Sequence, residues 1–160
     1  MKYFTFDWWE NPEFDPFKEY HSYIEKVLPE LPSDLQRLEQ KCTLHDGRIT
    51  RLHIEPIQKT LELELVGACC DESLPKSYAR LYRLTYKELE SFTSIANPKK
   101  RLGGPGGYGD LGYDEIEVLG PGRFEHRMLF STSIEFHVRF GSFSLWYEDY
   151  DFDAKGYGTV

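Results

Sequence analysis

The fold class is decided by RITRLHIEPIQKTLELELVG, residues 48 to 67, where apolar residues recur with a period of two. Closing this stretch with a loop centred between Ile57 and Gln58 puts apolar pairs on one face and opposite charges on the other. Those pairs are Leu52 with Leu63, Ile54 with Leu61, Arg51 with Glu64 and His53 with Glu62. Such pairing favours two antiparallel strands. The stretch is therefore predicted to form a β-hairpin.

The C-terminal half shows the same alternation from about Tyr113 to Glu148. Loops at 120–122 and 131–133, followed by a Gly141-Ser142 turn with glycine first, align four apolar runs on one face. The aligned residues include Ile116, Val118, Phe124, His126, Met128, Phe136, Val138, Phe140, Phe143 and Leu145. We therefore expect a C-terminal four-stranded meander, in which Phe140 faces Phe143 across the last turn.

Two helices are expected before the strands. DPFKEYHSYIEKVL (15–28) opens with an N-cap Asp15 and Pro16, and SDLQRLEQKC (33–42) opens with Ser33 and Gln36 in a capping-box relation. Residues 78–92 fit a strand nearly as well as a helix, and we favour a strand followed by a turn. The predicted class is α+β: two N-terminal helices followed by an antiparallel β-sheet of six or seven strands. We expect residues 1–148 to form a single domain and residues 149–160 to form an acidic, frayed tail.

The composition of the chain limits the kinds of partner that the protein is expected to bind. The net charge of −8 over 160 residues disfavours nucleic acid and anionic membranes, which need neutralising cations, and is compatible with a basic protein partner. No apolar run approaches the roughly 20 residues of a membrane span. The N-terminus lacks the aliphatic stretch of a signal peptide. Three cysteines, Cys42, Cys69 and Cys70, are more typical of reduced thiols than of a disulfide framework. We expect a cytoplasmic protein without a cofactor.

The pair His45-Asp46, within TLHDGRI (43–49), is a candidate metal site. A metal needs three or four ligands that converge on one point, and the remaining histidines are dispersed over the predicted elements. The structural interpretation is a helix-to-strand corner, with Asp46 accepting backbone N–H groups and Gly47 supplying an unusual φ. We favour the corner. A small metal-dependent hydrolase that uses His45 and Asp46 stays open as the alternative.

Three other motifs lack the context that their chemistry needs. GPGGYG (104–109) matches the dinucleotide fingerprint, but a strand follows it where a helix is required. The tail places Asp149, Asp151 and Asp153 at calcium-loop positions, yet Ala154 and Val160 stand where glycine and glutamate are needed. His126 falls on the apolar face and is expected to be a hydrogen-bonded core histidine.

The polar face of the C-terminal strands is a candidate binding surface. In the predicted register His137 lies centrally, flanked by Arg127 and Trp146, with Glu135 nearby. An exposed tryptophan among charges is typical of a binding surface. The same pattern is expected if the N-terminal FTFDWW segment covers this face. We therefore take Arg127, Glu135, His137 and Trp146 as candidate partner-binding residues and assign no catalytic residue.

Three segments, KYFTFDWW (2–9), LHDGRI (44–49) and the late strands DEIEVL (114–119) with FEHRMLFSTSIEFHVRF (124–140), resemble a family of bacterial proteins of unknown function. The chain is also similar to small α+β immunity proteins that neutralise secreted toxins. The resemblance implies no established activity, cofactor or catalytic residue. The acidic charge, the aromatic residue on the polar face and the lack of a complete catalytic constellation favour a non-enzymatic, immunity-like protein-binding domain. The oligomeric state is left open.

Overall fold

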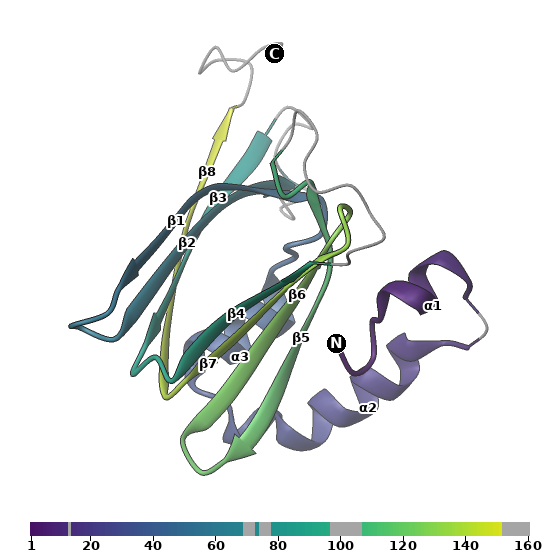
Figure 1. Cartoon of the computed structure of the whole chain (residues 1–160), viewed down its shortest axis with the longest axis horizontal. Helices are drawn as coiled ribbons and strands as arrows, with labels where there is room; N and C mark the ends of the chain where they lie inside the picture. The colour runs from purple at the N-terminus through teal and green to yellow at the C-terminus, as the bar shows by residue number, and fades with distance from the viewer. Residues whose placement is uncertain (13, 69–72, 74–77, 97–106, 152–160) are drawn as a thin grey trace.

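The computed structural model describes residues 1–12, 14–68, 73, 78–96 and 107–151. Its N-terminal part is helical, with one short helix more than the two expected (Figure 1). These elements are α1 (Phe6–Glu10), α2 (Pro16–Val27), the 3-10 turn η1 (Leu28–Glu30) and α3 (Ser33–Lys41). Within the described residues, no helix is both long and apolar enough to cross a membrane.

The caps explain where the two longer helices begin. The Asp15 carboxylate accepts the backbone N–H of Phe17 at 3.0 Å, and Pro16 occupies the first position of α2, as predicted. The capping box predicted at Ser33 is wrong, because Pro32 is the N-cap of α3 and makes no side-chain cap bond. Instead, the Gln36 amide donates to the carbonyl of Leu31 at 2.8 Å.

Eight strands form one antiparallel sheet in the order β4-β7-β6-β5-β1-β2-β3-β8. The bounds are β1 (Gly47–Glu55), β2 (Thr60–Ala68), β3 (Tyr78–Lys87), β4 (Ser91–Ala96), β5 (Asp110–Gly120), β6 (Arg123–Phe130), β7 (Ile134–Phe140) and β8 (Ser142–Asp151). The sheet exceeds the expected six or seven strands. The α+β class, with helices preceding an antiparallel sheet, is confirmed.

The predicted registers hold wherever a hairpin joins neighbouring strands. β1 and β2 pair Leu52 with Leu63 and His53 with Glu62, as expected from the alternation. The predicted pairings of β5 with β6 and of β6 with β7 also occur: Ile116 with His126, Val118 with Phe124, His126 with Val138, Phe124 with Phe140 and Glu125 with Arg139. Residues 78–87 form a strand, as favoured, but the following turn leads directly into β4.

The prediction that the last strand pairs with β7, as the fourth strand of the meander, is wrong. β8 pairs with β3 over ten residue pairs, from Tyr78 with Asp151 to Lys87 with Ser142, and the neighbour of β7 in that position is β4. The Phe140 and Phe143 rings still lie 5.9 Å apart, but around a bend and not across a hairpin. Alternation specifies which face of a strand is buried, and it does not specify the neighbouring strand.

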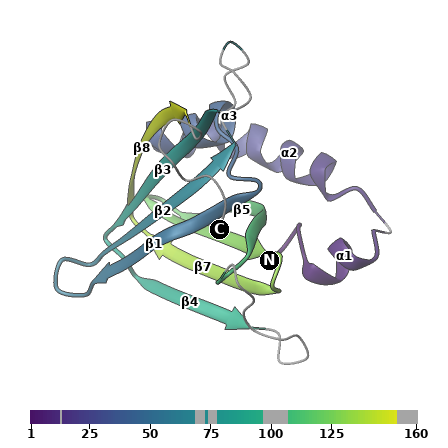
Figure 2. The ribbon, with the colours of Figure 1, turned by 90° about the horizontal axis from the view of Figure 1, so that it is seen from above.

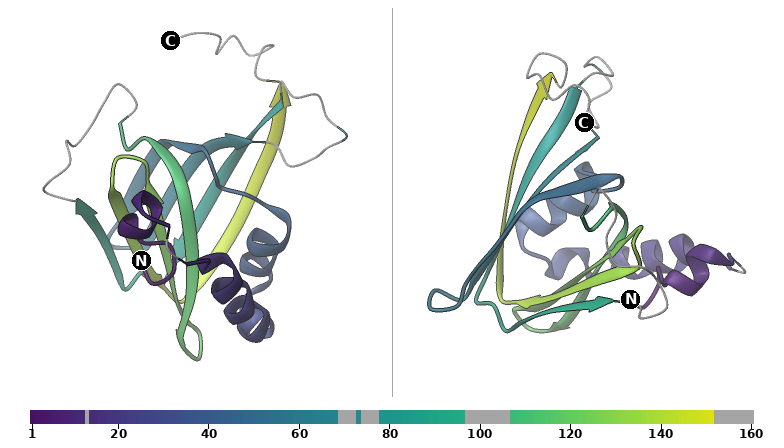
Figure 3. Two further views of the ribbon diagram at one scale, coloured as in Figure 1. Left: turned by 90° about the vertical axis from the view of Figure 1, so that its right-hand side faces the viewer. Right: turned by 45° about the horizontal axis from the view of Figure 1, so that its top comes forward.

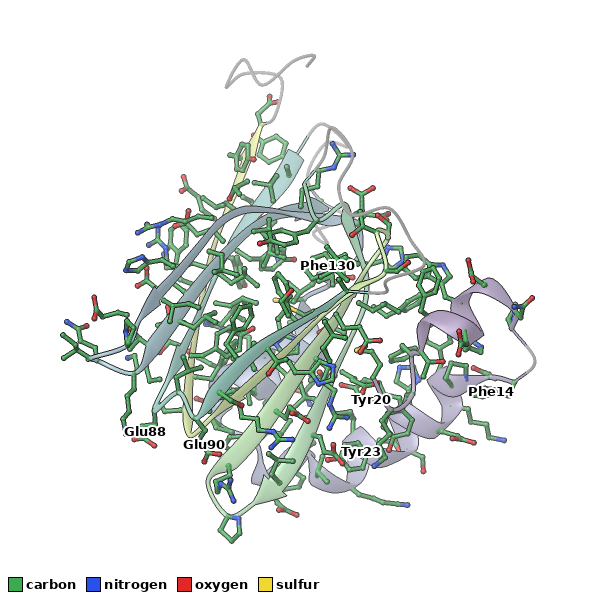
Figure 4. The ribbon with its side chains drawn as sticks, viewed as in Figure 1. Phe14, Tyr20, Tyr23, Glu88, Glu90 and Phe130 are labelled. Atoms are coloured by element: carbon green, nitrogen blue, oxygen red, sulfur yellow. The ribbon has the colours of Figure 1, made fainter. Side chains whose placement is uncertain are left out.

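The sheet consists of two similar halves. β1-β2-β3 and β5-β6-β7 are three-stranded meanders, and each third strand bends and continues as the edge strand of the other half, β3 into β4 and β7 into β8. The bends touch: the N–H of Gly141 donates to the carbonyl of Lys87 at 3.2 Å, and a Cβ at Gly141 would lie 2.2 Å from the Glu88 carboxylate. Figure 4 labels Glu88 and Glu90 at this corner.

Because of these bends, the sheet curls around its own core, and its two halves are inclined to one another (Figure 3). On the opposite margin, the described residues of the two halves pair at Gly47 with Leu111 and at Arg48 with Asp110. Beyond them β1 and β5 separate. The core between the halves is apolar and aromatic, and includes the fully buried Tyr82, Tyr86, Phe136 and Phe140.

Helices α2 and α3 complete the free edges of β5 and β8 (Figure 2). Their side chains bond backbone groups that no strand reaches. The Ile116 N–H donates to the Tyr20 hydroxyl and the Val118 N–H to the Tyr23 hydroxyl, both at 2.8 Å, while the Leu145 N–H donates to Asp34 at 2.9 Å and its carbonyl accepts from Arg37. An edge strand otherwise leaves such groups unpaired. The helices therefore act as a lateral extension of the sheet.

β8 continues through Asp149 and Tyr150 to Asp151, residues that the sequence assigned to the tail. Asp149 accepts from Arg80 at 2.5 and 2.7 Å, and Tyr150 is buried. Cys69, Cys70, the first three residues of GPGGYG (104–106) and the tail after Asp151 lie outside the described residues.

Disulfide trapping distinguishes the two topologies. Thr85 pairs with Ser144 in the structure, whereas the predicted hairpin would pair Arg139 with Ser144. In a background whose three native cysteines are serine, T85C/S144C is expected to oxidise to an intramolecular disulfide, since paired Cα atoms lie within bridging distance. R139C/S144C is the matched control and should stay reduced. Efficient crosslinking of the control alone, seen by mass spectrometry, would contradict the β3–β8 pairing.

Candidate functional site

A cavity of about 320 Å³ lies between α2, α3 and β5. It combines aromatic walls with acidic and imidazole groups. The described lining residues are Phe4, Phe17, Tyr20, His21, Leu38, Glu39, Cys42, Thr43, Leu44, His45, Gly112, Tyr113 and Asp114. Figure 4 shows Tyr20 where α2 approaches β5. The volume lies at the small end of the range for ligand sites, roughly 300–1,000 Å³.

The N-terminal segment supplies one wall of this cavity, and Glu115 holds it there. The Glu115 carboxylate on β5 is buried and accepts the backbone N–H groups of Lys2 at 2.5 Å, Tyr3 at 2.9 Å and Phe4 at 3.3 Å. The Phe4 ring then stacks on Tyr113 at 5.2 Å, so a carboxylate on the outer face of the sheet orders an aromatic wall on the rim of the cavity.

A bulge in β5 lets the N-terminal segment pack closely against the strand. The register with β6 shifts between Leu111 and Tyr113, at Gly112. A Cβ at Gly112 would lie 2.4 Å from the Trp9 ring, so only glycine lets α1 pack here. Trp9 and Trp8 then contact Tyr113 edge-on, each at 5.3 Å.

A buried hydrogen-bonded chain ends at the cavity. The Tyr86 hydroxyl lies 2.8 Å from His126 Nδ1, and His126 Nε2 lies 3.0 Å from the Asp114 carboxylate. Complete burial raises the pKa of Tyr86 well above its ordinary value, so the phenol keeps its proton and can donate a hydrogen bond to Nδ1. In the tautomer that accepts this bond, the hydrogen of the ring is on Nε2 and points at Asp114. His126 is the core histidine that the sequence predicted, and its role here is to orient a cavity carboxylate.

Glu39 is the second carboxyl group of the cavity. It projects from α3 and accepts the Tyr20 hydroxyl at 2.9 Å, while that same hydroxyl accepts the N–H of Ile116. Burial, followed by the charge of Asp114, raises the pKa of Glu39 to about 8. At neutral pH Glu39 is therefore mainly a neutral acid, beside a carboxylate that already carries charge.

His45 and Asp46 form the corner that the sequence favoured. The N–H of Asp46 donates to the Leu111 carbonyl at 2.8 Å and that of Gly47 to the Leu44 carbonyl at 2.9 Å, which ties the corner to β5. The left-handed residue is Asp46, with φ of 61°, and not Gly47 as expected. His45 Nδ1 lies 3.2 Å from the Asp46 carboxylate, and His45 also lines the cavity. Among the described residues, no group of three or more His, Cys, Asp or Glu could hold a metal ion.

Three of the four candidate partner-binding residues lie together beneath the N-terminus. Arg127 pairs with His137 across β6 and β7, and His137 Nε2 lies 2.9 Å from Glu135. The Glu135 carboxylate also accepts from the Met1 ammonium at 2.8 Å. Hydrogen bonding from His137, together with this ammonium, lowers the pKa of Glu135 to about 2. Arg127 is engaged by Glu115, Glu117 and Glu125.

Trp146 lies elsewhere. It stands on β8 next to Arg83 of β3, whose guanidinium carbon is 5.1 Å from the indole ring centre. The predicted placement beside His137 depended on the hairpin that does not form. Trp146 is 44 % exposed and is available to solvent, whereas the N-terminal segment bonds Glu135 and Glu115, the neighbours of His137 and Arg127.

The sequence contained signals for the carboxyl groups that were missed. Asp114 alternates with Ile116 and Val118, which places a carboxylate on the apolar face of its strand. Glu39 follows Leu35 by four residues and so falls on the buried face of α3. Their proximity to one another depends on how α3 packs on the sheet, which neither pattern specifies.

Comparison with known proteins identifies no relative. No family model matches the chain, and no curated protein or solved structure matches it either. The resemblance drawn from the three sequence segments therefore stays a prediction, and the chemistry of the cavity is argued from its own residues.

Replacing Glu39 by Gln should stabilise the protein at neutral and alkaline pH. The folded-state pKa of about 8 lies above that of an unfolded glutamate, so wild-type stability is lost as the pH rises from roughly 4.5 through 8. Glutamine keeps the neutral form at every pH. We expect the melting temperature of Glu39→Gln to exceed that of wild type by on the order of 5 °C at pH 8.5.

At pH 5 the two proteins should melt within about a degree of one another, because that pH lies only about half a unit above the pKa of an unfolded glutamate and most of the loss of wild-type stability occurs at higher pH. Glu25→Gln, on the exposed side of α2, is the control and should show no such pH dependence. A constant difference between Glu39→Gln and wild type from pH 5 to pH 8.5 would contradict the raised pKa.

Proposed function

We propose that this protein is a binding protein whose cavity accepts a cationic group, an ammonium or a guanidinium. The observation that carries the proposal is the presence of two carboxyl groups, Glu39 and Asp114, in one cavity whose described lining contains no lysine or arginine. The expected cytoplasmic, non-enzymatic character and the basic partner are retained as parts of this proposal.

The electrostatics favour a cation over a neutral ligand. Without a ligand, burial and the Asp114 charge keep Glu39 protonated near neutral pH. A cation between the two carboxyl groups would offset both effects, so that Glu39 releases its proton and forms a charge-assisted contact. The bound state then contains two carboxylates and one cation. Binding is thereby coupled to proton release.

The aromatic walls suit the same kind of ligand. Phe4, Phe17, Tyr20 and Tyr113 line the cavity, and a cation over such rings is stabilised by the ring quadrupole, by about 0.5–2 kcal/mol. At the rim, Phe17 is 42 % exposed, and Phe14 beyond it is 54 % exposed. Exposed aromatic residues around a polar cavity are typical of protein interfaces. A basic side chain of a partner protein is therefore the source of the cation that we propose.

Calorimetric titration with choline tests the ligand chemistry, because its quaternary ammonium keeps its charge at every pH. We expect one choline per chain, with a Kd that falls about tenfold for each unit of pH between 6 and 7.5, since Glu39 must lose its proton first. Buffers of different ionisation enthalpy should report the release of close to one proton per choline at pH 6.5.

A neutral ligand and a Glu39 variant are the controls that show whether the cavity recognises the positive charge of choline. The neutral isostere 3,3-dimethylbutan-1-ol should bind at least tenfold more weakly than choline at pH 8.5. Glu39→Gln should lose both the pH dependence and at least tenfold in affinity, because the amide cannot become anionic. Equal affinity for choline and its isostere, or a Kd in wild type that is independent of pH, would rule out a cation site.

A further inference from the structure

The two halves of the sheet place equivalent residues at equivalent positions. Ile116 and Val118 of β5 face His126 and Phe124, as Leu52 and Ile54 of β1 face Leu63 and Leu61. Leu145 of β8 faces Leu84, as Phe92 of β4 faces Val138. The free edges of β5 and β8, one in each half of the sheet, thus correspond to the free edges of β1 and β4, again one in each half.

One of these two pairs of edges is completed by helices. The N–H groups of Ile116, Val118 and Leu145 all donate to side chains of α2 and α3. Two of the side chains beneath are well shielded, since Ile116 is 1 % and Leu145 5 % exposed, and Val118 is partly buried. In a strand paired along one edge only, alternate residues direct their N–H and C=O groups outward, and the helices use such alternate groups.

The corresponding edges of β1 and β4 have no such cover within the described residues. No side chain there bonds the backbone of Leu52, Ile54 or Phe92, and none of the three has a further hydrogen bond. Their side chains point to the core but are only partly buried. Ser94 and Ala96, on the inward face of β4, are exposed. Figure 2 shows β4 on the side of the sheet away from α2 and α3.

We propose that the edges of β1 and β4 form a docking surface for an amphipathic helical segment of a partner protein. The helix would cover Leu52, Ile54 and Phe92 with its apolar face and bond their free N–H groups with hydroxyl or carboxylate side chains, as α2 and α3 do on the equivalent edges. A single added strand would pair one edge only and would leave the inward side chains between β1 and β4 uncovered.

This surface is distinct from the cation cavity, because the two share no residue. A partner could therefore dock here whether or not the cavity is occupied. The absence of charge along β4, SFTSIA, supports a contact that excludes water, since exposed edge strands in soluble proteins usually carry charges that prevent pairing.

The test uses the chain's own helix pair as the probe, because the equivalent edges already accept it. A synthetic peptide of residues 15–42 is titrated into the ¹⁵N-labelled full chain, and amide shifts are followed by NMR. We expect saturable 1:1 binding with the largest shifts at Leu52, Ile54 and Phe92. Phe92→Asp should weaken binding at least tenfold. Thr93→Asp, on the outward face of the same strand, should bind like wild type.

Other results would overturn the proposal. Shifts at Ile116, Val118 and Leu145 would mean that the peptide exchanges with the resident helices. No saturable shift at millimolar peptide would mean that the β1 and β4 edges do not accept a helix pair. A full chain that sediments as a dimer, and becomes monomeric in Phe92→Asp, would assign the surface to a second copy of the chain. The wild-type shift map decides these cases even if Phe92→Asp does not fold.

Discussion

Unpaired strand edges are the constraint on which the rest of the structure depends. Backbone N–H and C=O groups at the edge of a sheet need partners when water cannot reach them. The bends at Glu88 and Gly141 let β4 and β8 cross to the other half, but β1 and β5 still separate after two residue pairs. Side chains of α2 and α3 then complete β5 and β8, and this requirement fixes where the helices lie (Figure 1).

The candidate site follows from that placement. The hydroxyl of Tyr20 caps an N–H of β5, and because it also donates to Glu39 it draws a carboxyl group of α3 out of water. Asp114 arrives from the strand, oriented by a buried histidine. Two carboxyl groups are thereby held together among aromatic rings, at the cost of Glu39's charge. A cation would offset that cost, so the structural device that completes the sheet also creates the proposed chemistry.

The alternation of apolar residues along the chain predicts much of this fold. It does not predict which strands pair when they are far apart in the sequence. Alternation predicted the β1–β2 and β6–β7 registers residue by residue. In a hairpin the partner of each strand is the next strand along the chain, and the apolar residues identify which face of both strands is buried. It failed at β8, because Phe143 and Leu145 bury equally well beside β3 and beside β7. For the site, His126 was placed correctly in the core. Glu39 and Asp114 each sit on a buried face by spacing, but only the packing of α3 brings them together.

The central claim is that Glu39 is a neutral acid at neutral pH in the unoccupied cavity. The most direct measurement is an NMR titration of the side-chain carboxyl carbons, with the Glu39 signal assigned through Glu39→Gln. A Glu39 midpoint near pH 8 is the predicted result. A midpoint near 4.5, the ordinary value for glutamate, would show that the carboxyl group is hydrated and that neither burial nor Asp114 disfavours its charge. That result would contradict the account of the cavity as a cation site.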